Sequence, residues 1–258
     1  MIISSAKQLK QYRTAAKIST EILWQLHQKT AKGVTPLEID ALADRLCRQH
    51  NVRPNFKGVG SPQNPYQHAT CISVNDTVVH GIPQDVPLMD GDLVKVDFGI
   101  EYEGLNTDHC FTIGIGELTN TDTRLLTIGR SAVLAAAKNA IAGKQTGDLG
   151  NIMETTARKN GFSVTKQYVG HGIGRSLHEE PQLPAWGKPG TGTKLMKGMV
   201  LCVEAQLLAG GDEVYVAPDG WSVKTQDGGR AVMFEFMVIV DSSKSEILTQ
   251  TMAWPLLV

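Results

Sequence analysis

The sequence predicts an α+β fold of two similar halves, about residues 1–118 and 119–258, within a single domain. The main observation is a repeat, because residues 89–97 and 196–204 each have glycine two positions after methionine, then an apolar run, then an acid. The two segments lie 107 positions apart. A short apolar run after a glycine turn is typical of a buried strand, and packing alone does not favour an acid at its end. No stretch has the composition of a flexible linker.

Each half is expected to open with two helices. Apolar residues at helical spacing predict the first helix of each half: Leu9, Tyr12, Ala16, Ile22 and Leu26, then Leu125, Ile128, Ala132 and Ala136. Residues 35–38, Thr-Pro-Leu-Glu, match a capping box with proline at the first helical position. The counterpart helix begins near Asp148. Ile39 and Leu149 lie 110 positions apart, close to the offset of the strand repeat, so the duplication covers helices as well as strands.

Runs of β-branched and apolar residues between Gly, Asp and Pro clusters predict the strands. These runs are 71–74, 93–98, 109–115, 200–204 and 232–240. Asp97 and Asp108 flank Gly104 at a spacing that suits two neighbouring antiparallel strands joined by a turn. The expected architecture is therefore two helix pairs, each with its own antiparallel sheet.

Composition excludes several classes of protein. Of 258 residues, 41% are hydrophobic and 20% charged, which is typical of a globular protein. The balance of 25 basic and 26 acidic residues, with no like-charge block, argues against a nucleic-acid or anionic-membrane partner. No segment is apolar enough to span a membrane, and the N-terminus does not resemble a signal peptide, so we expect a cytoplasmic monomer. Four unpaired cysteines indicate free thiols.

The acids at the predicted strands indicate a metal site. Asp97, Asp108, Glu204 and Glu235 all lie in or beside apolar runs, and buried acids at close range repel one another unless protons or a cation neutralise them. His171 and His80 are each followed by Gly-Ile, as if the duplication extended to these histidines. With His171, the four acids suit a pair of divalent first-row ions, Mn, Fe, Co or Zn, and fit a thiolate site poorly. Such a pair activates water and polarises a carbonyl, which is hydrolytic chemistry.

Lys95 conflicts with this pattern. By the two-residue alternation of a strand, Lys95 and Asp97 share one sheet face, which would bury a lysine beside the acids. A β-bulge between them would remove the conflict.

Three long segments closely resemble type I methionine aminopeptidases: residues 73–83, 170–181 and 219–225. The resemblance spans nearly the whole chain and is to the short bacterial form, without a zinc-finger extension. It implies the pita-bread fold and removal of the initiator methionine from nascent chains when the second residue is small. A further implication is a dinuclear centre with ligands Asp97, Asp108, His171, Glu204 and Glu235.

The resemblance also implies roles around the metals. Glu204 would serve as general base, His178 would hydrogen-bond the scissile carbonyl or tetrahedral intermediate, and His80 the departing nitrogen. Tyr66, Cys71 and Trp221 match positions that line the family's methionine pocket. Expected partners are the N-termini of nascent polypeptides and the ribosome surface.

The chain departs from the family pattern near several of these residues. Ala205 stands where the family commonly has proline, and Phe236 where it has histidine. Gly99 follows Asp97-Phe, a form more like Xaa-Pro aminopeptidases, and Leu177 replaces a frequent aromatic residue. Altered neighbours can change metal affinity and pocket shape.

Two other functions remain open from the sequence. One is an Xaa-Pro-type aminopeptidase of the same fold, although those enzymes usually carry an extra N-terminal domain. The other is a non-catalytic pita-bread binding protein, for which loss of ligands would be the expected sign, whereas all five are present.

Overall fold

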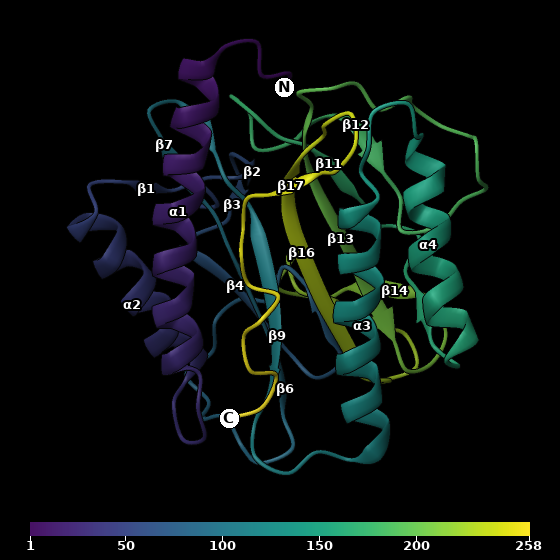
Figure 1. Ribbon diagram of the computed structural model, residues 1–258. Helices are drawn as coiled ribbons and strands as arrows, with labels where there is room; N and C mark the ends of the chain where they lie inside the picture. The colour runs from purple at the N-terminus through teal and green to yellow at the C-terminus, as the bar shows by residue number, and fades with distance from the viewer.

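Two helix pairs flank a central set of antiparallel strands (Figure 1) in the computed structural model, which describes residues 1–258. The first pair is α1, Ala6–Lys29, and α2, Pro36–Gln49. The second pair is α3, Asn120–Lys138, and α4, Thr146–Lys159. The pairs lie on opposite sides of the strands (Figure 1), and the two predicted helix pairs are thus present.

The predicted capping box is present at the start of α2. The Thr35 hydroxyl accepts from Glu38 N, and the Glu38 carboxylate accepts from Thr35 N, so two otherwise unpaired N–H groups are bonded. At the start of α4, the Asp148 carboxylate accepts from Gln145 N at 2.7 Å. Both second helices therefore begin with an acid that closes back onto the residue before the helix.

The sheet of the first half has the order β4-β6-β9: Thr70–Val74, Leu93–Phe98 and His109–Gly114. All neighbours are antiparallel, and Asp97 is paired with Cys71 on one side and with Cys110 on the other. Between β6 and β9 the chain forms β7, Ile100–Tyr102, and β8, Leu105–Asn106, joined through Gly104. This confirms the predicted antiparallel strands on either side of Gly104.

The sheet of the second half has the order β12-β11-β13-β16-β17, with β10 also paired to β13. These strands are Glu179–Leu183, Gly170–Gly172, Val200–Leu208, Ala231–Ile239, Glu246–Ile247 and Ser163–Val164. The prediction that the apolar run ends at Glu204 is wrong, because β13 continues to Leu208 in an unbroken ladder with β16. Glu204 therefore lies in mid-strand, directly opposite Glu235.

Shorter strands complete the fold. β5, Thr77–Val79, joins β15, Val223–Thr225, and β14, Val214–Val216, in a three-stranded sheet. β1, Arg53–Pro54, pairs with β7, and β2, Gly60–Ser61, pairs with β3, Asn64–Pro65. The two histidines that are each followed by Gly-Ile do not occupy equivalent structural positions. His171 lies within β11, whereas His80 follows β5 and has a φ of 56°.

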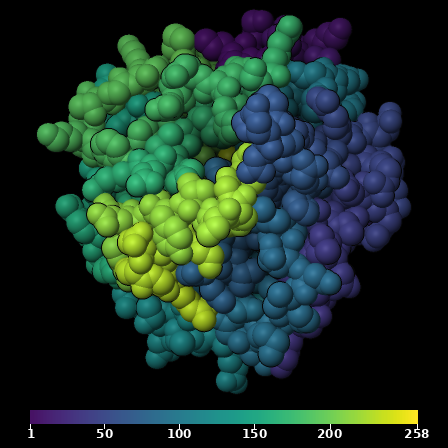
Figure 2. Space-filling view, turned by 180° about the vertical axis from the view of Figure 1, so that it is seen from behind, coloured from purple at the N-terminus to yellow at the C-terminus, as the bar shows by residue number.

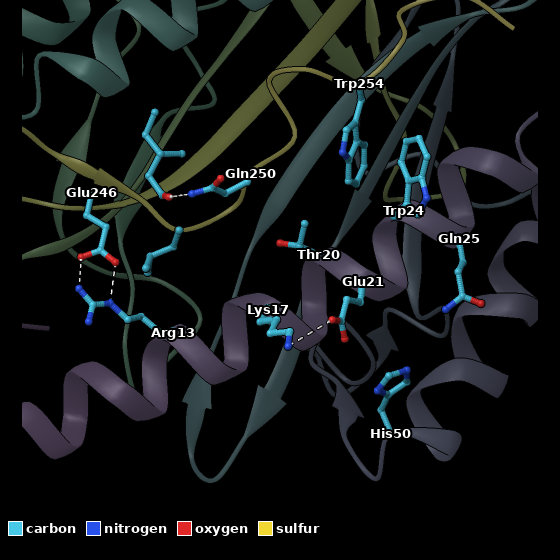
Figure 3. A pocket seen from close by; sticks show the side chains of 12 residues that line it. Arg13, Lys17, Thr20, Glu21, Trp24, Gln25, His50, Glu246, Gln250 and Trp254 are labelled. Carbon is cyan, nitrogen blue, oxygen red and sulfur yellow. Dashed lines mark hydrogen bonds and ion pairs between the residues drawn. The ribbon is translucent and has the colours of Figure 1, made fainter.

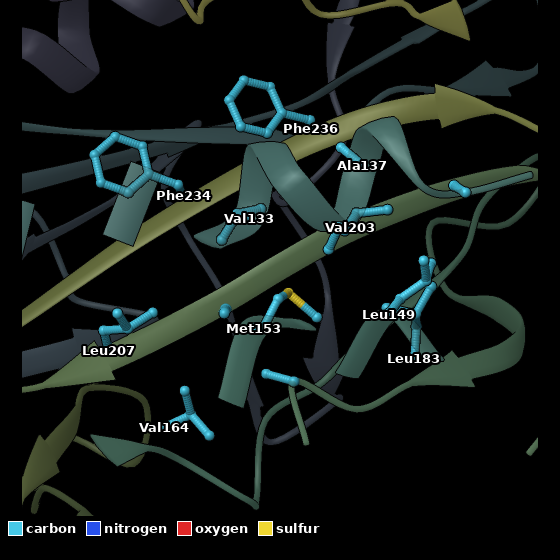
Figure 4. Packing of buried hydrophobic residues seen from close by; sticks show 14 of the residues in the cluster. Val133, Ala137, Leu149, Met153, Val164, Leu183, Val203, Leu207, Phe234 and Phe236 are labelled. Atoms are coloured by element: carbon cyan, nitrogen blue, oxygen red, sulfur yellow. The ribbon is translucent and has the colours of Figure 1, made fainter. Parts of the chain in front are cut away.

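Strand alternation divides each main strand into a helix-facing and an inner side. Val203 and Leu207 of β13 and Phe234 and Phe236 of β16 belong to one buried cluster with Val133 of α3 (Figure 4). Burying each such side chain stabilises the fold by roughly 1.5 to 3 kcal/mol. The residues between them, Glu204 and Glu235 among them, therefore project to the inner side of the sheet.

The inner sides of the two halves meet between β9 and β16. Thr112 on β9 accepts a hydrogen bond at its hydroxyl from Met233 N on β16 at 2.9 Å. In the first half, Val94, Val96 and Phe98 of β6 pack in a second buried cluster beneath the first helix pair. The inner side of each half thus carries its polar residues toward the other half.

Candidate metal centre and substrate pocket

Four carboxylates and one imidazole converge where the two inner sides meet. Asp97 is on β6, Asp108 immediately precedes β9, His171 is on β11, Glu204 is on β13 and Glu235 is on β16. His171 Nε2 lies 3.8 Å from Asp108 Oδ2 and 4.0 Å from Glu204 Oε1. Ligand atoms of Asp108, His171 and Glu235 all lie within 4.8 Å of one another. The structure thus brings together residues up to 138 positions apart in the chain.

Burial makes the ionised carboxylates costly. Desolvation and neighbouring acids raise the pKa of Asp97, Asp108 and Glu235 well above the usual range, and desolvation raises that of Glu204 to about 7. Asp97 Oδ1, Asp108 Oδ1 and Glu235 Oε1 are buried without a hydrogen-bond partner. Unpaired buried oxygens of this kind are unfavourable without a cation or proton to bind them.

The imidazole of His171 has the form of a ligand. Its Nδ1 donates to the carbonyl of Gly172 at 2.9 Å, which leaves the lone pair of a neutral ring on Nε2. Burial lowers the pKa of His171 to about 4, so the ring is neutral near pH 7. Its lone pair then faces the oxygens of Asp108 and Glu204, an arrangement that a cation or a proton between them makes favourable.

The chemistry of these side chains therefore suits the binding of divalent metal ions. Hard carboxylate oxygens with one neutral imidazole are the ligands of Mn, Fe, Co and Zn. Cys202 Sγ also belongs to the group of ligand atoms that lie within 4.8 Å of one another, and burial raises the pKa of its thiol well above the usual range. Of the five residues predicted as ligands, Asp108, His171 and Glu235 belong to this group together with Cys202, and Glu204 lies beside His171.

A cavity of about 230 Å³ opens onto the cluster. Figure 2 shows the hollowed face on which early, middle and late parts of the chain meet. All ten site residues predicted from the sequence line this cavity: Tyr66, Cys71, His80, Asp97, Asp108, His171, His178, Glu204, Trp221 and Glu235. Phe56, Tyr168 and Met233 also line it and were not predicted, because single apolar residues give no signal that separates a pocket from a core.

The two further histidines of the cavity have different aromatic neighbours. The His178 ring is 4.5 Å from that of His171, centroid to centroid, at the exposed mouth. The His80 ring packs edge-on to Tyr168 at 5.3 Å. Burial lowers the pKa of His80 to about 4 and also lowers that of His178, so both rings are neutral near pH 7.

One end of the cavity is apolar. Phe56, Tyr66 and Cys71 form a small buried cluster against which Leu177 and Trp221 pack. The Tyr66 hydroxyl donates toward the carbonyls of Thr70 and Gly81, both at 2.9 Å, so the ring is held in place in a T-shaped contact with Trp221. An end lined by rings and a thiol suits an unbranched apolar side chain.

Most of the residues that depart from the family pattern do not line the cavity. Ala205 and Phe236 lie in the helix-facing cluster and not beside the acids. Gly99 is required by packing, because a Cβ there would lie 2.2 Å from the carbonyl oxygen of Thr107. Leu177 is the departure that lines the cavity, and so it is the one that alters the pocket itself.

A larger and more open groove, of about 750 Å³, lies elsewhere, between α1 and the C-terminal segment. Its walls include the ion pairs Arg13–Glu246 and Lys17–Glu21 (Figure 3), and within each pair the two opposite charges neutralise each other. It contains no cluster of converging ligands. The chemistry of the molecule is therefore concentrated in the smaller cavity.

Comparison with known proteins agrees with this geometry. The sequence profile of Metallopeptidase family M24 matches residues 10–242, which is most of the chain. The chain belongs to metallopeptidase family M24. As an M24 metallopeptidase it has the pita-bread fold predicted from the sequence.

Relatives within the family are similar over almost their full length. A methionine aminopeptidase of Clostridium perfringens is 36% identical over 96% of this chain and 98% of its own. Methionine aminopeptidase 1 of Bacillus subtilis is 32% identical over 97% and 99%. The crystal structure of methionine aminopeptidase from Thermotoga maritima superposes with a TM-score of 0.92 at 36% identity, covering 96% of this chain and 99% of that one.

Prolidases share the fold alone. The prolidase of Pyrococcus horikoshii has a TM-score of 0.74 at 22% identity, and this M24 chain covers 63% of its length. None of the helices combines the length and apolar character that crossing a membrane requires.

Proposed function

We propose that this M24 metallopeptidase hydrolyses the peptide bond after an N-terminal methionine when the second residue is small. The observation that supports it most is the buried cluster of acids and neutral His171 beneath a small cavity with an apolar end. Full-length similarity to methionine aminopeptidases supports the same activity. Prolidases are similar only in fold, so the Xaa-Pro alternative is not favoured.

We infer two divalent ions of Mn, Fe, Co or Zn, held by Asp97, Asp108, His171, Glu204 and Glu235. Four carboxylates carry more negative charge than one divalent ion neutralises. Asp108 and Glu235 would hold the ions together with His171, since ligand atoms of the three lie within 4.8 Å of one another. When bound, the ions supply Lewis acidity toward a carbonyl oxygen and lower the pKa of water.

Glu204 is the proposed general base. Desolvation raises its pKa to about 7, so its carboxylate can accept the proton of an attacking water and pass it to the departing amine. Its two oxygens have different surroundings: Oε1 faces His171, and Oε2 accepts from Gln206. This division holds the carboxylate in one orientation toward the cavity.

The neutral histidines are proposed to bind the reacting amide. His178 at the mouth would donate to the carbonyl oxygen as negative charge develops on it. His80 would hydrogen-bond the nitrogen that departs. Tyr66, Cys71 and Trp221 would surround the methionine side chain, with Leu177 beside them.

The substrates that follow are the N-termini of nascent polypeptides, acted on near the ribosome surface by a cytoplasmic monomer. Residues 1–258 would act as one catalytic domain, because both halves supply ligands. The small cavity leaves little room for a large second side chain beside the metals and His80.

The test is release of methionine from a Met-Ala-Ser peptide after reconstitution with Mn or Co. We expect activity that requires metal and that falls at least about 10²-fold in Glu204→Gln, the loss typical of removing a general base. Glu213→Gln, on the exposed loop before β14, is the matched control and should keep full activity. Metal-independent release, or full activity of Glu204→Gln, would contradict the proposal.

A further inference from the structure

Lys95 is a buried lysine that the reaction does not use. Its side chain is 1% exposed in the middle of β6, and it does not line the cavity. The ladder of β6 with β4 and β9 is unbroken, so no bulge turns Lys95 away from the side that Asp97 occupies. Lys95 and Asp97 therefore share one face of β6, and hydrogen bonds of the Lys95 amine satisfy its buried N–H groups.

The amine of Lys95 binds two backbone carbonyls from separate segments. Nζ donates to the carbonyl of Asn75, between β4 and β5, at 2.9 Å and to that of Ala231, the first residue of β16, at 2.9 Å. No carboxylate pairs with it among the ion pairs of the structure. Burial lowers its pKa to about 7, while the two carbonyl oxygens favour the protonated amine.

Each of the three joined segments leads into the active site. Asp97 is two residues beyond Lys95 on the same side of β6. Glu235 is four residues beyond Ala231 on β16, and so lies on the same side of that strand. The segment that begins at Asn75 leads through β5 to His80.

The carbonyl of Asn75 is itself held rigidly. Asn75 has φ of 54°, which is unusual for a residue other than glycine. Its carbonyl also accepts from Ala231 N at 3.1 Å, and its N–H donates to Leu93 O at 2.9 Å. Its side-chain oxygen accepts from Leu93 N and from Arg230 Nη1. The amine therefore links backbone segments that other hydrogen bonds also hold, so a displacement of one segment would displace the others.

We propose that Lys95 is a positioning residue that occupies, with its own amine, a cation-binding point between the two halves and thereby fixes Asp97 against Glu235. Carbonyl oxygens that converge on one point are ligands for hard cations such as K⁺. The amine fills that point from within the chain, so the protein needs no bound monovalent ion there. The activity readout of this inference rests on the proposed function.

Lys95→Met tests the positioning role, because methionine keeps the aliphatic volume and removes the N–H donors. A misplacement of about 1 Å in a site can lower turnover about 10²-fold, so we expect kcat to fall between about 10- and 100-fold. KM should change little, because Lys95 does not touch the pocket. The Kd for Mn, measured by calorimetry, should rise about tenfold.

The matched control is Ser245→Ala, which removes another buried donor to a backbone carbonyl, that of Ala137, far from the cavity. It should lower the melting temperature without changing kcat or the Kd for Mn. If Lys95→Met behaved like Ser245→Ala, with only a loss of stability, the positioning role would be wrong. If wild type itself released no methionine, the proposed function would fail, whereas a changed Kd for Mn in Lys95→Met would still support the positioning role.

Lys95→Ala tests the cation-binding point. It leaves the carbonyls of Asn75 and Ala231 facing a cavity, so KCl should raise its melting temperature and its affinity for Mn saturably, relative to choline chloride at equal ionic strength. Wild type and Lys95→Met should respond equally to the two salts. If folded Lys95→Ala showed no preference for KCl, or wild type shared the preference, the point would not be cation-selective. Should Lys95→Ala not fold in choline chloride, refolding in KCl but not in choline chloride is the supporting result, and no refolding in either contradicts it.

Discussion

Gln206 donates a hydrogen bond from Nε2 to Glu204 Oε2 at 2.6 Å, two residues further along the same side of β13. The Gln206 side chain is fully buried, and its own amide oxygen has no partner. Hydrogen bonds to a charged group are worth about 1.5 to 3 kcal/mol, which is enough to fix one carboxylate oxygen. Oε1 of Glu204 is thereby left toward His171 and the cavity.

Gln206→Met should lower kcat about tenfold, because it removes a charge-stabilising donor at nearly constant volume. The same donor lowers the pKa of Glu204, so its loss should move the acidic limb of the pH–rate profile to higher pH. Steady-state kinetics between pH 5 and 9 measure both effects. Gln250→Met, on the exposed C-terminal segment, should change neither. An unchanged pH profile in Gln206→Met would mean that this hydrogen bond does not control the pKa of Glu204.

Glu204→Gln should stabilise the metal-free protein in a pH-dependent way. The folded pKa of Glu204, about 7, lies above its ordinary value of 4.5, so the folded state binds the extra proton and stability is lost as pH rises between these values. The variant has no such loss. We expect the difference in unfolding free energy, from urea titration in EDTA, to grow from near zero at pH 4.5 to roughly 2 to 3 kcal/mol at pH 8. A constant difference across this range would contradict the assignment.

Asp108→Ala should reduce the number of Mn ions bound per chain from two to at most one, because it removes a proposed ligand that lies beside both His171 and Glu235. In wild type, metal at 100 times its Kd should raise the unfolding free energy by about 2.7 kcal/mol for each independent site. Calorimetry and thermal unfolding measure these quantities. Asp90→Ala, at an exposed ion pair with Lys32, should bind as wild type does. Equal metal content in Asp108→Ala would remove that residue from the site.

His178→Ala should lower kcat about 10²-fold with a smaller change in KM, since the proposed hydrogen bond strengthens as the carbonyl oxygen gains charge. His50→Ala, in the outer groove of Figure 3, replaces a histidine remote from the acids and should be fully active. If His178→Ala changed only KM, the role of His178 would be substrate binding without stabilisation of the transition state.

Much of the fold follows from the repeat. Helical spacing and the Thr35 capping box predicted the helix pairs, and the glycine-to-acid segments predicted β6 and β13. The end of β13 was wrong because Gln206 interrupts the apolar run, although its side chain lies on the inner side, where polar residues are satisfied. Three-residue strands such as β5 and β15 carry too little pattern to be predicted.

The sequence also predicted the acids that line the cavity, because acids in apolar runs are costly and therefore stand out in the sequence. The hydrogen bonds that hold these acids and their strands in place could not be predicted from the sequence. Gln206 and Lys95 each lie two residues from a predicted ligand on the same strand face, so alternation placed them near the site. Their partners, Glu204 Oε2 and two distant carbonyls, depend on tertiary structure and appear only in three dimensions.

Release rates across peptides, compared for one metal-reconstituted preparation, distinguish a methionine aminopeptidase from an Xaa-Pro peptidase. We expect rapid loss of methionine from Met-Gly and Met-Ala peptides, slow loss from Met-Lys and Met-Phe, and little cleavage of Ala-Pro or Gly-Pro peptides. Discrimination against an N-terminal leucine should be moderate, because one apolar group is worth only about 1 to 3 kcal/mol. Preferential cleavage of the proline peptides, or no cleavage of any peptide with Mn, Co, Fe or Zn, would show that the proposed methionine aminopeptidase activity is wrong.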